Sequence, residues 1–205
     1  MSPESESPAA KARIAPRRVP LWGHLLIAAG IMAVAAFIEF EMGRLPICKC
    51  GHIRFWVGNV NSPENSQQIA DWYSFSHIIH GFALYGIMRL IGRRRWPIGW
   101  CLVAAVFVEA SWEVLENSSF IINRYRHETM SLDYYGDSIL NSMSDILFCV
   151  LGFFLAARLP VWVTVALVVV MEVGVGYAIR DNLTLNIIML IHPFDAIRHW
   201  QMGRG

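Results

Sequence analysis

Long apolar segments alternate with short polar stretches along this 205-residue chain. Five segments are each close to the ~20 residues that an α-helix needs to cross the ~30 Å hydrocarbon core of a bilayer. They cover residues 21–40, 72–91, 97–115, 137–158 and 160–179. A further apolar stretch, LTLNIIMLIHPF at 183–194, is too short to span, and Pro193 closes it. The pattern predicts an all-α, polytopic transmembrane helix bundle of about five spans, with a short C-terminal interfacial or re-entrant segment.

The start of the chain predicts its domain organisation. Residues 1–20, MSPESESPAAKARIAPRRVP, are polar, rich in proline and without hydrophobic periodicity, which is typical of a disordered tail. The first apolar segment follows basic residues, as in a signal peptide, but the residues after it, FEMGRLP, contain no small-residue cleavage site. We therefore expect an uncleaved first span, with residues 21–205 forming a single transmembrane domain.

The distribution of Lys and Arg predicts how the spans are oriented. These residues are dense before the first span, between the second and third, and between the fourth and fifth: Lys11, Arg13, Arg17, Arg18, Arg93, Arg94, Arg95 and Arg158. Five spans place the three sites on one side, which the positive-inside rule makes cytoplasmic. The opposite side also carries basic residues, so the bias is one of local density. We expect a cytoplasmic N-terminus and larger loops, 41–71 and 116–136, that face the exterior.

Composition agrees with a membrane protein and excludes one class of partner. Apolar residues make up 55% of the chain and charged residues 16%, whereas a soluble domain is usually about one-quarter charged. The formal net charge is +1, so the chain lacks the basic excess that nucleic-acid binding requires. We expect membrane lipids as partners and no nucleic acid.

Ionisable side chains recur inside the predicted spans. Each is costly there, about 2.5–3.5 kcal/mol on insertion scales, and such residues usually face the bundle interior or a water-filled cavity. Helical spacing places each set on one face of its helix. The sets are His77 and His80; Glu109, Glu113 and Glu116; and Asp137, Asn141 and Asp145. The fifth span contributes Glu172, eight residues before Arg180.

With the predicted orientation, these groups share one layer in the outer half of the membrane. At ~1.5 Å rise per residue, each lies within ~12 Å of the outer end of its span. Packed carboxylates repel one another, and a cation relieves that repulsion. Imidazole together with carboxylate suits Zn, Fe or Mn, and bundle cores host such sites. We therefore expect a polar cavity, with a divalent metal as the candidate cofactor.

Two overlapping sets of residues are candidates for function in that cavity. The candidate metal ligands are His77, His80, Glu113, Asp137 and Asp145. The candidate catalytic residues are His77, His80, Glu109 and Glu113, acting as acid, base or ligand. The Glu-x-x-His repeat of di-iron bundles is absent, so the ligand pattern is not diagnostic. A structural interpretation stands beside this one, because polar groups between helices also hydrogen-bond to one another with modest net stabilisation.

The loop sequence CKCGH is a second candidate for metal binding. Cys48, Cys50 and His52 carry suitable ligand atoms, but C-x-C is shorter than the usual C-x₂₋₄-C spacing and no second cysteine pair completes a tetrahedron. The alternatives are a disulfide between the two cysteines or two free thiols.

Several stretches together resemble one known family. They are CKCG, ENSQQIADWYSFSHIIHGF, SWEVLENS, YYGDSILNSMSD and RDNLTLNIIMLIHPFDAIRHWQ. They are similar to a family of small multi-pass bacterial inner-membrane proteins that is named only as a domain of unknown function. The resemblance implies a location in a bacterial inner membrane, and it carries no activity or cofactor. A single helix, GDSILNSMSDILFCVLGFF, is also similar to the D-x-x-x-N…G pattern of VanZ-like membrane proteins.

Three functions remain open from the sequence. The first is a non-catalytic envelope assembly or interaction factor, favoured by the lack of a recognised nucleophile or metal motif. The second is a membrane-embedded enzyme, with or without a metal, acting on a lipid or envelope precursor. The third is a proton-coupled transporter that uses the same acids as a relay; the absence of repeat symmetry in five spans disfavours it.

Overall fold

The computed structural model describes residues 19–92, 95–128 and 134–203. Within these ranges the chain forms eight helices and no strand: α1 (Leu21–Glu41), α2 (Ser74–Ile91), α3 (Ile98–Glu116), α4 (Ser119–Glu128), α5 (Ile139–Arg158), α6 (Val161–Ile179), α7 (Leu183–Ile191) and α8 (Asp195–Gln201). The predicted tail falls almost wholly outside the described ranges, as do Arg93 and Arg94.

Five of the helices correspond to the five predicted spans, and the prediction of a polytopic helical bundle is confirmed. Helices α1, α3, α5 and α6 are long and apolar enough to cross a membrane. Helix α2 is 18 residues long but less apolar, because two serines, two histidines and Arg89 interrupt its sequence. Helix α5 begins two residues later than expected, since Ser138 is its N-cap and accepts a hydrogen bond from the amide of Asn141. The short helices α4 and α8 were not predicted.

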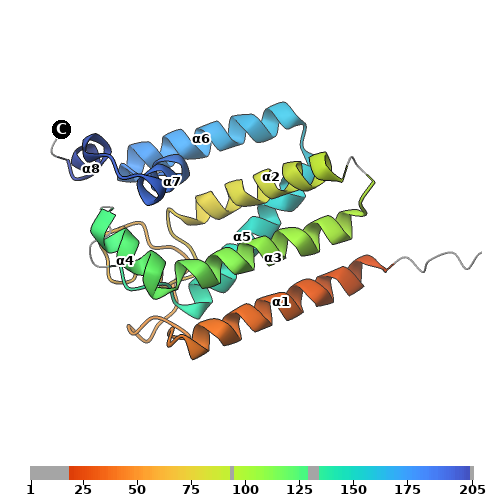
Figure 1. Cartoon of the computed structure of the whole chain (residues 1–205), viewed down its shortest axis with the longest axis horizontal. Helices are drawn as coiled ribbons and strands as arrows, with labels where there is room; N and C mark the ends of the chain where they lie inside the picture. Colours follow the sequence, from red (N-terminus) through yellow and green to blue (C-terminus); the bar gives the residue numbers. More distant parts are fainter. Residues whose placement is uncertain (1–18, 93–94, 129–133, 204–205) are drawn as a thin grey trace, which may run out of the picture.

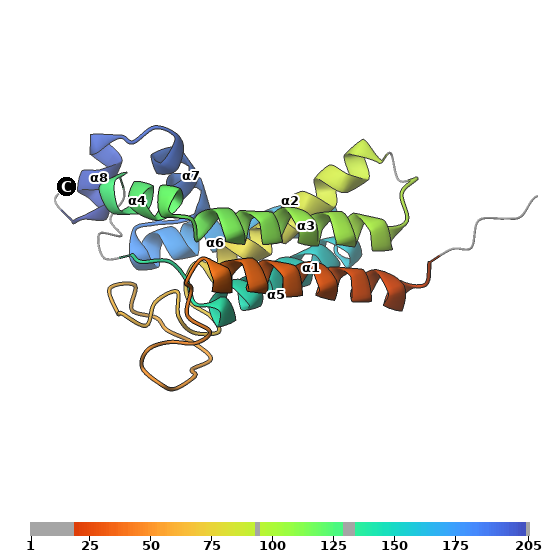
Figure 2. The same ribbon diagram turned by 60° about the horizontal axis from the view of Figure 1, so that its bottom comes forward.

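The long helices run side by side, and the remaining elements gather at one end of the bundle (Figure 1 and Figure 2). That end holds the segment 42–73, which connects α1 to α2, together with α4, α7 and α8. The connections between α2 and α3 and between α5 and α6 lie at the opposite end. We call the first of these the loop end.

An apolar core fills the bundle between α1, α3 and α5. Its fully buried members are Ala28, Ala35, Cys101, Leu102, Ala105, Val106, Ala110, Ile146 and Phe153. Four of the nine lie on the first turns of α3, nearest the end opposite the loop end, where the chain enters that helix. The polar residues that interrupt α2, α3 and α5 are thus concentrated toward the loop end.

Helices α2 and α5 approach one another so closely that two glycines are required at their contact. A Cβ added at Gly81 would collide with the carbonyl oxygen of Cys149, and one added at Gly152 would collide with the carbonyl oxygen of Ile78. Small residues allow helix backbones to approach in this way inside membranes. The contact fixes α2 against α5 one turn away from His77.

The segment 42–73 is anchored to the N-terminus of α5 by buried hydrogen bonds. The amides of Ile139 and Leu140 donate to the carbonyl oxygens of Leu45 and Pro46, so two of the helix's first amides find partners outside it. The side chain of Gln67 donates to the carbonyl oxygen of Gly136 over 2.8 Å. The amide group of Asn141 donates to the carbonyl oxygen of Gln68 over 2.9 Å. These bonds hold the segment over the loop end of α2, α3 and α5.

Replacing Gly81 by alanine tests the α2–α5 contact. The added methyl group has no room without separating the two backbones, so Gly81→Ala should lower the free energy of unfolding by about 1–3 kcal/mol or more. Gly86→Ala is the matched control on the same helix, because a Cβ there meets nothing within 4 Å. Thermal unfolding of the detergent-solubilised variants measures the difference. Equal midpoints for the two variants would show that the helices do not meet at Gly81.

Candidate functional site

A cavity of about 340 Å³ lies at the loop end, bounded by α2, α3, α5, α7 and the segment 42–73. Its lining falls into a polar part and an apolar part. The polar part includes five carboxylate residues and two imidazoles: Asp71, Glu109, Glu116, Asp137, Asp145, His77 and His80. The apolar part includes Ala83, Leu84, Val108, Leu183, Ile187 and Leu190. No Lys or Arg is among the described residues that line the cavity. The cavity is therefore acidic on one side and apolar on the other.

Two histidines of α2 converge on one glutamate of α3. Nδ1 of His77 lies 2.6 Å from Oε1 of Glu109, and Nδ1 of His80 lies 3.0 Å from the same oxygen. The i, i+3 spacing of the histidines places both rings on the face that α2 turns toward α3. One ligand atom from each of the three residues lies within 4.8 Å of the others, which is close enough for a single ion to be shared. We call His77, His80 and Glu109 the histidine cluster.

Glu113 lies one turn beyond Glu109 and is the least satisfied acid in the site. It is only 1% exposed, and neither of its carboxylate oxygens has a hydrogen-bond partner among the described residues. Its nearest charged neighbour is Nδ1 of His77, at 3.2 Å from Oε1, and that nitrogen lies closer to Glu109. Leaving a charged group buried and unbonded is costly, so a carboxyl group in this position needs a bound cation, an ordered water or a proton.

Asp145 of α5 lies on the other side of His77. Its Oδ2 is 3.8 Å from Nε2 of His77, and its Oδ1 accepts a hydrogen bond from the hydroxyl of Ser74 over 3.0 Å. His77 therefore presents one ring nitrogen to the glutamates of α3 and the other to a carboxylate of α5. In metal sites a carboxylate that is hydrogen-bonded to the second ring nitrogen orients the histidine, and Asp145 is placed for that role at an ion-pair distance.

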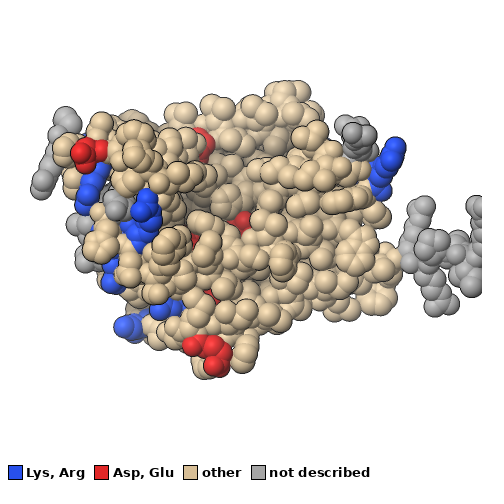
Figure 3. All heavy atoms as spheres, viewed as in Figure 1, with Lys and Arg blue, Asp and Glu red and all other residues tan. Residues whose placement is uncertain are grey.

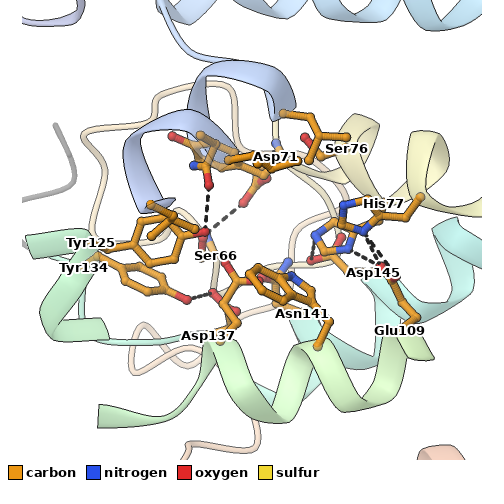
Figure 4. A pocket seen from close by; sticks show the side chains of 18 of the residues that line it. Ser66, Asp71, Ser76, His77, Glu109, Tyr125, Tyr134, Asp137, Asn141 and Asp145 are labelled. Atoms are coloured by element: carbon orange, nitrogen blue, oxygen red, sulfur yellow. Dashed lines mark hydrogen bonds and ion pairs between the residues drawn. The ribbon is translucent and has the colours of Figure 1, made fainter. Parts of the chain in front are cut away.

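The opposite side of the cavity is built by Asp137 and two tyrosines (Figure 4). The hydroxyl of Tyr134 donates to Oδ1 of Asp137 over 2.9 Å, and the amide of Asp137 donates to the side chain of Asn117 over 2.7 Å. The rings of Tyr125 and Tyr134 meet edge to face, with centroids 5.2 Å apart. Burial raises the pKa of Asp137 well above its usual range, and the charges of Glu116 and Asp145 raise it further. Figure 4 shows this group across the cavity from His77 and Glu109.

Asp71 holds the segment 42–73 in place at the rim of the cavity. One of its carboxylate oxygens accepts the amide of Ser66 and the other accepts the amide of Tyr73. Burial raises the pKa of Asp71, and these hydrogen bonds oppose the rise. The side chain thus orders the turn that leads into α2.

The structure brings most of the sequence-predicted residues together. His77, His80, Glu109, Glu113 and Asp145 form one group, whereas Asp137 lies with Glu116 and the tyrosines. Ligand atoms of Glu113, Glu116 and Asp137 also lie within 4.8 Å of one another, so Glu113 links the two groups.

Glu172 was expected in the same layer but has a different role. Its two carboxylate oxygens accept the amides of Leu183 and Thr184, which are the first residues of α7. A carboxylate at a helix N-terminus satisfies unpaired amides and opposes the helix dipole. The residue spacing along α6 could not indicate this capping role, because the amides that Glu172 binds belong to the next helix, α7. The sequence also gave no sign that Tyr125 and Tyr134 line the cavity.

The cysteines of the CKCGH sequence form a disulfide with each other, Cys48 to Cys50. Of the three alternatives that the sequence left open, the structure contains this one. The neighbouring His52 pairs instead with Glu64, at 3.2 Å from Nε2 to Oε2.

Comparison with known proteins finds close relatives but no described activity. A model of the family described as "Protein of unknown function (DUF2585)" matches residues 39–203. A UPF0314 protein of Rhizobium etli is 54% identical over 173 residues, which are 84% of this chain and 88% of the relative. UPF0314 proteins of Rhizobium meliloti and Paracoccus denitrificans are each 50% identical, over 91% and 90% of this chain and 93% of each relative. No solved structure matches. These matches agree with the first resemblance and give no support to the VanZ-like one.

Asp181 provides a pH-dependent test of how the C-terminal helices are attached at the loop end. Its carboxylate accepts hydrogen bonds from the hydroxyl of Tyr73 and from the side chain of Gln201 in α8. Burial raises its pKa from 3.8 to about 6, so the folded protein binds this proton more tightly than the unfolded chain. The corresponding stabilisation is complete below pH 3.8 and is lost as the pH rises through 6.

Asp181→Asn removes that titration and keeps hydrogen-bonding atoms at the position. Relative to wild type, the variant should gain stability between pH 5 and pH 7.5, by at most ~3 kcal/mol. Thermal unfolding of both proteins across this pH range measures the change. Parallel pH profiles for the two proteins would contradict the assignment.

Proposed function

The chain belongs to the DUF2585 family of proteins of unknown function, and we propose that it is a membrane-embedded, metal-dependent enzyme that acts on an amphiphilic molecule. The proposed ligands are His77, His80 and Glu109, with Glu113 beside them. Two histidines and one glutamate are a ligand set that catalytic zinc sites use, with a further coordination position left for water or substrate. Iron and manganese accept the same donor types.

The observation that carries the proposal is the state of Glu113. Its carboxylate is buried, without a hydrogen-bond partner among the described residues, and beside a second buried glutamate. Two neighbouring carboxylates without an adjacent Lys or Arg are unstable as charged groups in a low-dielectric interior. A divalent cation between the histidine cluster and Glu113 would satisfy both carboxylates at once.

The surroundings of the cluster are also those of a reactive centre. A bound divalent metal makes a coordinated water more acidic and polarises a substrate oxygen. In hydrolysis, Glu113, which lies behind the histidine cluster rather than on the cavity wall, would take a proton from a water held at the metal position as the oxygen of that water bonds to the substrate. Glu113 would then return the proton to the leaving group as the old bond breaks. Asp145 would orient His77 from the far side of the ring. These roles require a hydrolysable bond near the histidine cluster.

The alternative functions explain fewer of these features. A non-catalytic assembly factor needs polar contacts between helices, but it gains nothing from a buried carboxylate whose oxygens are unbonded. A proton-coupled carrier needs a polar route through the bundle. The described core toward the other end consists of side chains such as Leu102, Val106 and Phe153, which provide no such route.

We further propose a bacterial inner-membrane location with the N-terminus in the cytoplasm. The loop end would then face the exterior, and the cavity would lie in the outer half of the bilayer. Arg95, just before α3, and Arg158, the last residue of α5, lie at the opposite end of the bundle, and the sequence around Arg95 is dense in arginine, which supports this orientation. The family resemblance supports the membrane.

Metal analysis of the purified protein tests the proposal. Protein prepared in detergent without chelator, then supplied with Zn²⁺, Mn²⁺ or Fe²⁺ and desalted, should retain about one ion per chain. His77→Ala and Glu109→Gln should each reduce that content at least tenfold, because each removes one of three ligands. Elemental analysis by mass spectrometry measures the content, and the thermal midpoint of each variant shows whether it is folded.

His192→Ala is the control for this experiment. His192 is exposed at the end of α7 and does not line the cavity, so its replacement should leave the metal content unchanged. A folded wild-type protein that retains none of the three ions would refute the proposal. So would a cluster variant that retains as much metal as the control.

A further inference from the structure

The cavity opens toward the lipid between α2, α3 and α7. Ala83 and Val108, which line it from α2 and α3, are themselves exposed on the outer surface of the bundle, and so is Ile187 of α7. Figure 3 shows acidic atoms recessed among uncharged atoms in the middle of one face, whereas the Lys and Arg atoms visible on that face lie toward its two ends. An amphiphile from the bilayer can therefore place its polar head group beside the acidic residues while its apolar chains stay at the apolar opening of the cavity.

The sign of the charge in the cavity selects the head group. The described lining contains five carboxylate residues and no Lys or Arg. A divalent ion at the histidine cluster would offset charge at that side only, and Glu116 and Asp137 lie on the other. An anionic head is repelled by such a lining, and a cationic one is attracted.

Aromatic rings also line the cavity, and two of them lie beside Asp137. Tyr73, Trp112, Tyr125 and Tyr134 all line it. The rings of Tyr125 and Tyr134 form an edge-to-face pair next to the carboxylate of Asp137. Aromatic faces combined with carboxylates are the chemistry that recognises ammonium and quaternary ammonium groups. Ring faces and acids thus favour the same kind of occupant.

We infer that the amphiphile bound in this cavity is a lipid of the surrounding bilayer whose head group ends in an amine or a quaternary ammonium. The head lies between Tyr134, Tyr125 and Asp137, and the tails pass out between α2, α3 and α7. The inference rests on the proposed function, because it names the substrate class of the same cavity. It places the bond nearest the head group within reach of the histidine cluster.

Lipid titration of the purified protein tests this inference. The probes are phosphatidylcholine, phosphatidylethanolamine and phosphatidylglycerol with identical acyl chains, and native mass spectrometry measures their binding. Wild type should bind at least one of the first two lipids more tightly than phosphatidylglycerol. Tyr134→Leu and Asp137→Asn should each weaken the binding of that preferred lipid roughly five- to thirty-fold, because a cation–π contact or an opposite charge is lost. The ratio of the affinities for phosphatidylethanolamine and phosphatidylcholine shows whether the site prefers a primary amine or a quaternary ammonium group.

Two matched controls separate the cavity from the general lipid surface. Tyr177→Leu removes a tyrosine that is 92% exposed on α6, and it should leave binding unchanged. Ala83→Trp should close the mouth and abolish selective binding, whereas Ile87→Trp, one turn along α2 and outside the cavity, should not. Binding of phosphatidylglycerol equal to that of both other lipids would overturn the inference, as would unchanged binding in folded Ala83→Trp.

The metal content of the same samples separates the two proposals. A protein that retains its metal but shows no preference for an amine or ammonium head refutes the inference and leaves the proposed function intact. A protein that binds such lipids selectively but retains no metal refutes the metal-dependent function and leaves the lipid site intact.

Discussion

The arrangement of this protein depends on acidic side chains that are buried around one histidine, with no Lys or Arg in their ion pairs among the described residues. Glu109, Glu113 and Asp145 surround His77 inside a helix bundle, and in the described part of the chain their ion pairs are all with imidazole. A carboxylate in such a medium is stable only with a positive partner or after taking up a proton. A bundle needing polar contacts alone would bury hydroxyls and amides at much lower cost. The presence of these buried acids is best explained by the binding of a positively charged ligand.

The fold supplies the rigidity that such a site requires. The glycine contact between α2 and α5 sets the position of His77 relative to Asp145, and α3 brings Glu109 and Glu113 to the same place. The segment 42–73 closes the site from the loop end through buried bonds to the first turn of α5. Each wall of the cavity therefore belongs to an element that is fixed by contacts elsewhere. Ligands on elements held in this way keep their geometry when an ion or substrate enters.

The sequence predicted the helices and the polar cluster for one physical reason. Apolar length and helical spacing are local properties, and they placed His77 with His80 and Glu109 with Glu113 on single helix faces. That these faces meet is a tertiary property, and the expectation succeeded because buried charges avoid lipid. The same reasoning failed for Glu172, whose carboxylate caps α7. Spacing along one helix cannot show a partner that belongs to the next element. Tyr125 and Tyr134 were missed for the same reason, since they lie in or beside a short helix that the hydrophobic pattern did not indicate.

In the proposed enzyme, His77, His80 and Glu109 bind the metal ion directly. X-ray absorption spectroscopy of the zinc-loaded protein reads the donor atoms without reference to any activity. We expect a first shell of nitrogen and oxygen at about 2.0–2.1 Å with the multiple-scattering signature of two imidazoles. A shell containing sulfur at about 2.3 Å, or oxygen donors without imidazole, would place the ion elsewhere and rule out the histidine cluster as its site.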